Sequence, residues 1–258
     1  MSHPYRSEAR ALADAMQLSC GHIPSGSALA FSGGLDSSVL AFLLGEKARL
    51  YVCGSEESPD ARAAVRAARI LEMDVMRAPP HDIEGILRTI GAAIPGKLLA
   101  IEATILVPFA TVCEEAMESR VVTGQGADEL FGGYARYLRK SPSDAVEEMK
   151  SDFRRLLERG ARHERLVAEE FGKEVVHPFI HEGVVAAANV TPEAHFHGGK
   201  RKALLMEAAR TLGLPEPLIG TPKRAAQYGS GATKAIARAA KEREMGVPEY
   251  VGWALGRN

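Results

Sequence analysis

The chain has 258 residues, 46% hydrophobic and 25% charged, with a formal net charge of −1. This length can bury a full core as one large domain or as one domain with an added lobe. A charge so near zero gives no electrostatic reason to expect nucleic acid as a main partner. No apolar run approaches the ~20 residues of a membrane span. The three scattered cysteines fit reduced thiols, so we expect a cytoplasmic protein without a disulfide framework.

The first elements form a strand, a glycine-rich turn and a helix. Residues 5–18 carry apolar side chains at helical spacing, which predicts a short amphipathic helix. The apolar run 28–31 then predicts a strand, and a helix-forming run reaches Leu44 after the turn at 32–38. The first backbone N–H groups of a helix have no intrahelical partner, and the helix dipole is positive at that end. The arrangement therefore predicts an anion-binding site.

The residues of this turn suit a phosphate group. Gly33 and Gly34 let the backbone approach a ligand closely, and Asp36 can hold a magnesium ion. Hydroxyl donors stand at Ser32, Ser37 and Ser38. The turn is neither a Walker A sequence nor a Gly-x-Gly-x-x-Gly motif. A simpler interpretation is a tight turn in which Asp36 or a serine is an ordinary N-cap.

Strands and helices alternate through the first half of the chain. Further strands are predicted at 49–53, 74–77 and 120–123, and helices at 58–71, 81–93 and 100–119. This alternation predicts an α/β fold, a parallel sheet with helices on both faces. Ligands of such sheets sit at the carboxyl ends of the strands. The loops after the first, second and fourth strands carry Asp36, Asp60 and Asp128, so we expect these acids at one edge.

The pattern changes near residue 140, where strand signals vanish. Helical stretches dominate from there, at 143–160, 162–171, 200–212 and 232–245. We therefore predict a helical C-terminal lobe and no long linker. The expected division is an N-terminal helix at 1–24, an α/β core at 25–140 and a helical part of the same domain at 141–258.

A second informative stretch follows the fourth predicted strand. It reads Thr123-Gly124-Gln125-Gly126-Ala127-Asp128-Glu129-Leu130-Phe131-Gly132-Gly133-Tyr134. Two glycines allow the backbone to pass close to a ligand, and two carboxylates begin a short predicted helix. By themselves the carboxylates are also explained as compensation of the helix dipole.

Both stretches resemble known motifs. Residues 32–38 resemble the pyrophosphate loop of the ATP pyrophosphatases, and residues 124–134 resemble the Gly-Glu-Gly-Ala-Asp-Glu-x-Phe-Gly-Gly-Tyr block of asparagine synthetases. Weaker similarity extends the match to roughly residues 25 to 240, through the segments 58–60, 164–165, 172–180, 202–205 and 222–231. The resemblance is to the synthetase domain of that family. It implies an adenine nucleotide alpha hydrolase-like fold.

The resemblance implies roles for particular residues. Asp36 and Asp128 would hold Mg²⁺ on the phosphates of ATP, while Lys202 and Lys223 would neutralise the pyrophosphate. Contacts to ATP or pyrophosphate would come from Ala30, Ser32, Gly33, Gly34, Asp36, Ser37, Ser38, Cys53 and Gly124. The simpler interpretation of each lysine is a solvated surface charge.

One position departs from the family in a way that matters for chemistry. Asparagine synthetases carry glutamate where this chain has Gln125, and lactam-forming relatives carry tyrosine. An amide cannot serve as a carboxylate base, although it can orient an amine by hydrogen bonds. Glu164 or Glu129 would then be the candidate base. His177 and Met206 also differ from the usual residues of the family.

The function implied by the resemblance is an AMP-forming carbon–nitrogen ligase. ATP would adenylate a small-molecule carboxylate, and ammonia or an amine would accept the acyl group. About 25 residues precede the loop, too few for a glutaminase domain, so the nitrogen would come from ammonia, an amine or a separate glutaminase subunit. Two alternatives stay open: an adenylating enzyme with another acceptor such as tRNA, and a non-catalytic nucleotide-binding relative. Homo-oligomerisation also stays open.

Overall fold

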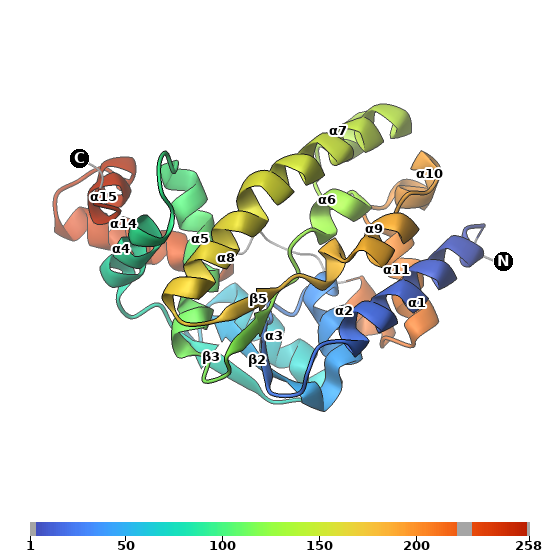
Figure 1. Ribbon diagram of the computed structural model, residues 1–258, viewed down its shortest axis with the longest axis horizontal. Coiled ribbons are helices and arrows are strands. Elements are labelled where there is room, and N and C mark those ends of the chain that lie inside the picture. The colour runs from blue at the N-terminus through green and yellow to red at the C-terminus, as the bar shows by residue number, and fades with distance from the viewer. Residues whose placement is uncertain (1–3, 221–228, 257–258) are drawn as a thin grey trace.

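A five-stranded parallel sheet forms the centre of the computed structural model, which describes residues 4–220 and 229–256 (Figure 1). Its strands are β1 (Ser27–Ala30), β2 (Ala48–Cys53), β3 (Val75–Ala78), β4 (Arg120–Val122) and β5 (Glu174–Val176). They lie in the order β3-β2-β1-β4-β5, and every neighbouring pair is parallel. The predicted α/β sheet is confirmed. Because the order reverses between β1 and β4, the crevice expected to bind ligands lies there.

Strand β5 corrects the prediction that strand signals end near residue 140. Its three residues pair with β4 from Arg120↔Glu174 to Val122↔Val176. An ion pair between Arg120 Nη2 and Glu174 Oε2, 2.7 Å long, fastens its first residue to β4. Three residues are too few to show an alternating pattern in a sequence. The segment after residue 140 therefore contributes directly to the sheet.

Helices from both ends of the chain cover the first face of the sheet. They are α1 (Arg6–Gly21), α2 (Leu35–Leu44), α3 (Pro59–Ile70), α9 (Glu182–Ala187), α11 (Ala203–Leu212) and α12 (Glu216–Ile219). The sheet contributes Leu29, Leu50 and Val122 to this core, all fully buried. Figure 1 shows α1 running beside α9 and α11, so N-terminal and C-terminal segments share this layer.

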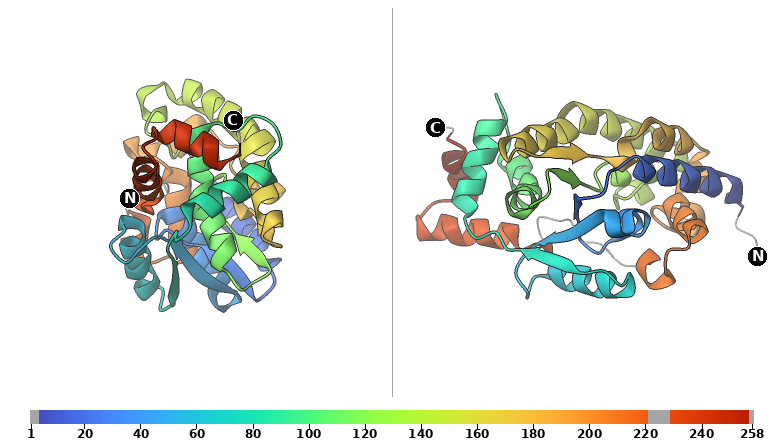
Figure 2. Two further views of the ribbon diagram at one scale, coloured as in Figure 1. Left: turned by 90° about the vertical axis from the view of Figure 1, so that its left-hand side faces the viewer. Right: turned by 60° about the horizontal axis from the view of Figure 1, so that its bottom comes forward.

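A second set of helices covers the opposite face. They are α4 (Ile83–Ala93), α5 (Ala100–Glu115), α8 (Ala161–Glu170), α14 (Ala232–Glu242) and α15 (Val247–Ala254). Ala28, Tyr51 and Val121 point to this side because strand side chains alternate between faces. Figure 2 shows α14 and α15, in red, against α4 and α5 at one end of the molecule. Both faces of the sheet are thus buried, as parallel sheets require.

A long helical rod crosses the top of Figure 1. It consists of α7 (Pro142–Arg155), a π-helical turn (Leu156–Gly160) and α8. Short helices α6 (Ala127–Phe131) and α10 (Pro192–His195) lie beside it. The helix predicted over 200–212 begins at Ala203, because Lys202 has a left-handed backbone with φ +56°. Within the described ranges, no helix is both long and apolar enough to cross a membrane.

We predict that Gly33→Ala destabilises the fold. Gly33 has φ +71°, and a Cβ there would lie 2.6 Å from the backbone carbonyl carbon of Ala63 in α3. The loop must therefore move away from α3, which we expect to lower the free energy of unfolding by about 2–4 kcal/mol. Urea denaturation measures this loss. Gly21→Ala is the matched control, because a Cβ at Gly21 meets nothing within 4 Å. Equal stability of the two variants would contradict the prediction.

Burial of His195 predicts a loss of stability in acid. His195 at the end of α10 is 2% exposed, and burial lowers its pKa from the ordinary value of 6.5 to about 4. Below pH 6.5 the His195 imidazole is protonated in the unfolded chain but stays neutral in the folded chain, so stability falls as the pH drops toward 4. We expect this residue to account for a loss of about 3 kcal/mol between pH 7 and pH 4.

The difference between His195→Gln and the unsubstituted protein isolates this contribution. Both proteins are unfolded with urea at pH 7 and at pH 4. The variant should lose less stability than the unsubstituted protein over this interval. An identical pH dependence for the two would show that His195 does not carry the effect.

Candidate functional site

The predicted strand–turn–helix at β1 is present, and α2 begins directly after the glycines. Gly34 is the N-cap of α2, with extended backbone angles. Ser37 Oγ donates to the Gly34 carbonyl at 3.1 Å and lies 3.4 Å from Ser32 Oγ. The buried Ser38 Oγ has no hydrogen-bond partner among the described residues. The turn thus places hydroxyl groups around the N-terminus of a ten-residue helix, where an anion is favoured.

The buried ammonium group of Lys202 joins the two motifs. Its Nζ lies 2.6 Å from Asp36 Oδ1 and 2.6 Å from Asp128 Oδ1. The side chains of Lys202 and Asp36 are 10% and 4% exposed, and that of Asp128 is 27% exposed. A single cation therefore offsets two carboxylates that would otherwise repel each other at short range. The solvated-charge interpretation of Lys202 is wrong, because its side chain is buried.

Glycines allow the backbone to come this close. A Cβ at Gly133 would lie 1.9 Å from Asp128 Oδ1 and 2.5 Å from Lys202 Cε. A Cβ at Gly124 would lie 3.4 Å from the Cβ of Asp36. The loop after β4 therefore packs directly on the first turn of α2. A side chain at Gly133 would push Asp128 and Lys202 away, whereas a Cβ at Gly124 would make an ordinary contact.

The paired carboxylates fit a magnesium ion that is shared with phosphate. Mg²⁺ in nucleotide sites is held by one or two carboxylates together with phosphate oxygens and water. Asp36 and Asp128 supply that number of carboxylates, and both line the same cleft. In the described part of the chain, no group of three or more His, Cys, Asp and Glu side chains could hold a metal by itself. The donor set therefore suits a metal that arrives with a phosphate ligand.

A second polar cluster centres on Glu164 of α8. Its Oε2 accepts a hydrogen bond from Thr123 Oγ1 at 3.1 Å and lies 2.8 Å from His177 Nε2. The Glu164 and His177 side chains are 11% and 8% exposed. The backbone N–H of Gln125 donates to the same Thr123 hydroxyl at 3.3 Å. The carboxylate considered as a base is thus held rigidly next to Gln125, and its contact with His177 was not predicted.

Glu129 forms a third buried carboxylate in α6. Burial raises the pKa of its carboxyl group, and the hydrogen bond from Tyr134 opposes this shift. Tyr134 Oη donates to Glu129 Oε1 at 2.5 Å. Burial and the neighbouring Glu129 also raise the pKa of the Tyr134 phenol. Tyr134 therefore remains a neutral donor that fixes the direction of Glu129.

These groups surround one cleft at the carboxyl ends of β1, β2 and β4. Many of the predicted site residues line it: Ala30, Ser32, Asp36, Ser37, Cys53, Gly124, Gln125, Asp128 and Glu164. Asp60 lines it too, so the three acids expected at one edge do share one cleft. Burial raises the pKa of Cys53 to about 12, so this residue contributes a neutral thiol.

Other predicted residues lie outside the lining of the cleft. Gly33 packs on α3, Gly34 is the N-cap of α2, and Ser38 lies in the first turn of that helix. Lys202 is buried against the two aspartates. Lys223 falls in 221–228, outside the described residues, so its role stays a prediction.

The structure adds an apolar wall from α5, formed by Ile105, Pro108, Phe109 and Val112. In the sequence these residues resemble ordinary core positions, so no signal distinguished them.

The fold and the site together define a class of protein. A glycine turn at a helix N-terminus, two carboxylates and a buried lysine meet where the order of a parallel sheet reverses. Such a crevice is the usual ligand site of open α/β sheets. The arrangement is that of a phosphate-binding α/β domain.

Comparison with known proteins identifies the family. The family model described as asparagine synthase matches residues 10–174, more than half of the sequence. A putative glutamine-hydrolysing asparagine synthetase of Methanocaldococcus jannaschii is 29% identical over 255 residues, which cover 82% of this chain and 47% of that protein. An asparagine synthetase domain-containing protein of Homo sapiens is 36% identical over 124 residues, covering 44% of this chain and 19% of that protein. The chain belongs to the asparagine synthase family.

Two further facts accompany this assignment. The chain spans less than half the length of these curated relatives. A solved structure of NMN synthetase from Francisella tularensis aligns with a TM-score of 0.42 at 12% identity, covering 100% of this chain and 88% of that one.

We predict that Lys202→Met destabilises the protein and creates a response to magnesium. Removal of the ammonium leaves Asp36 and Asp128 facing each other, which should cost about 3 kcal/mol of unfolding free energy. A divalent cation can then replace the lost charge. Millimolar MgCl₂ should therefore raise the melting temperature of the variant more than that of the unsubstituted protein.

Differential scanning calorimetry with and without MgCl₂ measures both effects. Lys200→Met is the matched control, because Lys200 is an exposed neighbour outside the ion pairs. If Lys202→Met were as stable as this control, the ammonium would not be holding the two motifs together.

Proposed function

We propose that the chain is an AMP-forming carbon–nitrogen ligase that uses ATP to adenylate a carboxylate and transfers the acyl group to ammonia or an amine. The observation that carries this proposal is the junction of the two motifs, in which Lys202 bridges Asp36 and Asp128 at the switch point of the sheet. Membership of the asparagine synthase family supports it. We also propose a cytoplasmic location, in keeping with the three free, buried cysteines.

In the first half of the reaction, a carboxylate oxygen attacks the α-phosphorus of ATP. The bond from that phosphorus to the oxygen of the β-phosphate breaks, and pyrophosphate leaves. The leaving group is highly charged, so oriented donors and cations must offset its charge. The hydroxyls of Ser32 and Ser37 and the N-terminus of α2 are the donors. Lys202, which is paired with Asp36 and Asp128 next to the cleft, would be one cation, and Lys223 would be a second.

Magnesium fits this half of the reaction. Asp36 and Asp128 would hold the ion, which supplies charge neutralisation on the phosphates of ATP. Lys202 pairs with both carboxylates and holds them close together. The protein's own contribution is therefore a pair of carboxylates that Lys202 holds close together.

In the second half, the nitrogen lone pair forms a bond to the acyl carbon. The bond from that carbon to the AMP oxygen breaks, AMP leaves, and the nitrogen gives up a proton to a base. We propose Glu164 as the base, because it lines the cleft beside Gln125 and its orientation is fixed by Thr123 and His177. Gln125 would orient the nitrogen through its amide oxygen.

The source of nitrogen is part of the same proposal. Free ammonia, an amine substrate or ammonia delivered by a separate glutaminase subunit would each serve the second half-reaction. Adding glutamine with and without candidate glutaminase subunits, and comparing the rate with that in ammonium chloride, separates these cases.

We predict that Asp128→Asn abolishes most activation of the acid. The assay is carboxylate-dependent ATP–pyrophosphate exchange, run over a panel of acids that begins with aspartate. Loss of one carboxylate from the pair should lower the exchange rate at least roughly 100-fold. Asp74→Asn, at an exposed residue before β3, is the control and should leave the rate unchanged. ATP binding without exchange for any acid would favour a non-catalytic relative, and AMP transfer to tRNA would favour a different acceptor.

A further inference from the structure

A second cavity, separate from the cleft, lies beside α6. It has a volume of about 300 Å³, within the range of small-molecule sites. Its walls come from α6, α7, α9, α10 and the segment between α9 and α10, and they are mainly hydrophobic. The apolar lining residues are Leu130, Val146, Met149, Phe153, Val185 and Val190. Nothing in the two half-reactions described above uses this space.

Glu129 stands between this cavity and the cleft. It is a lining residue of both, and it is 8% exposed. Tyr134 fixes the direction of the carboxylate by the hydrogen bond described above. A ligand that fills the apolar cavity therefore meets a hydrogen-bond acceptor at the boundary with the cleft that contains Asp36 and Asp128.

The other polar groups of the cavity are few. His195 is almost fully buried, and its Nδ1 has no hydrogen-bond partner among the described residues. Lys150 is an exposed residue, and its ammonium pairs with Glu147 Oε1 at 2.8 Å. Asn189 also lines the cavity and is exposed, so the buried polar residues of the lining are Glu129 and His195, and no lysine or arginine of the lining is buried.

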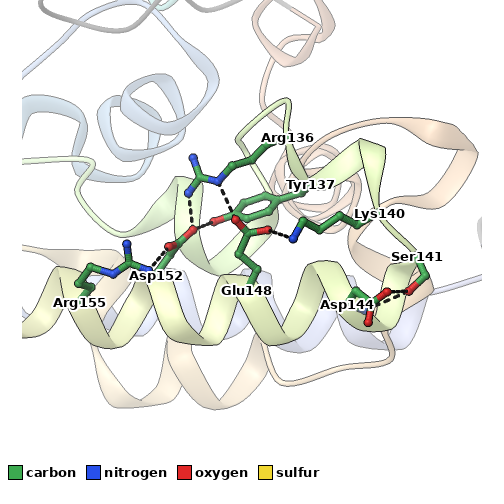
Figure 3. Close-up of polar contacts among 8 residues, drawn as sticks. All are labelled: Arg136, Tyr137, Lys140, Ser141, Asp144, Glu148, Asp152 and Arg155. Carbon is green, nitrogen blue, oxygen red and sulfur yellow. Dashed lines mark hydrogen bonds and ion pairs between the residues drawn. The ribbon is translucent and has the colours of Figure 1, made fainter.

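A charged network holds the wall of the cavity in place (Figure 3). Arg136 bonds both Glu148 and Asp152 of α7, and Tyr137 Oη donates to Asp152 Oδ2 at 2.6 Å. Lys140 Nζ lies 3.0 Å from Glu148 Oε2. These contacts fasten α7 to the segment after α6, so the apolar face of α7 is positioned without a ligand. The cavity is formed in advance of binding.

We propose that this cavity binds the apolar tail of the amine substrate, with the amine nitrogen held at Glu129 on the boundary of the cleft. The inference rests on the proposed function and names the class of acceptor: a primary amine with an aliphatic chain. Charge complementarity selects the amine over the acid, because Glu129 attracts N–H donors and repels a carboxylate. Ammonia alone would leave the apolar walls uncovered, and water finds few polar partners there.

Binding is tested first, independently of catalysis. The probe is n-hexylamine, and saturation-transfer NMR measures its binding with and without ATP and MgCl₂. Val146→Phe places a larger side chain in the cavity from α7. Val190→Phe does so from the segment after α9, in case the first variant folds poorly. Ser143→Phe adds the same ring to an exposed position of α7 outside the cavity. We expect binding to the unsubstituted protein and to Ser143→Phe, and its loss in both filled variants.

Kinetics then separate the amine from the acid. With an acid that supports ATP–pyrophosphate exchange, amide formation is compared for ammonia and for n-alkylamines from methyl to hexyl. We expect kcat/KM to rise with chain length and the filling variants to lower it for hexylamine by roughly tenfold or more. The rate with ammonia and the KM for the acid in exchange should stay within about twofold.

Two results would overturn the inference. One is failure of n-hexylamine to bind, or equal binding to the filled variants. The other is a change in the KM for the acid in exchange, which would assign the cavity to the acyl substrate. Absence of exchange with every acid would contradict the proposed ligase activity instead, and the binding experiment would still decide what the cavity holds.

Discussion

The ion pairs of Lys202 are the constraint on which the site depends. They tie together the turn after β1, the loop after β4 and the start of α11. Asp36 and Lys202 are 166 residues apart in the sequence. Two carboxylates this close repel each other when charged, and Lys202, whose backbone is left-handed, supplies a cation from the C-terminal half of the chain. Assembly of the phosphate side of the cleft is therefore coupled to docking of α11. A chain that ended before α11 would retain both motifs and lack the group that holds them together.

The parallel sheet explains why this junction lies where it does. Strands β2 and β3 lie on one side of β1, and β4 and β5 lie on the other. The chain therefore leaves β1 and β4 in opposite directions along the sheet, and the loops after these two strands lie next to each other. Glycines then set how closely the loops approach. Gly33 lets the first turn pack on α3, while Gly133 leaves room for Asp128 and Lys202. The helix N-terminus and the carboxylates consequently face one cleft.

Much of this could be predicted from the sequence, because the two motifs are local and their residues are consecutive. The strand–turn–helix at β1, the acids at one sheet edge and the family all follow from short stretches. Features built from distant segments could not be predicted. The three residues of β5 are too few for a pattern, and the α5 wall has the composition of a core helix. The contact between Glu164 and His177 depends on how α8 packs beside β5. The apolar cavity is assembled from α6, α7, α9 and α10, none of which carries a motif for it.

The π-helical turn between α7 and α8 has a consequence for how the two ligand spaces relate. A π turn contains an additional residue and so rotates the helix after it relative to the helix before it. In this rod, α7 presents Met149 and Phe153 to the apolar cavity, while α8 presents Glu164 to the cleft. Gly160, the last residue of the turn, packs next to the Gln125 amide. The turn thus sets the rotation of α8 about the helix axis relative to α7. Deleting one residue there would restore a regular helix, and either α7 would turn away from the cavity or α8 would turn away from the cleft. The π turn therefore fixes how both helices face their ligand spaces.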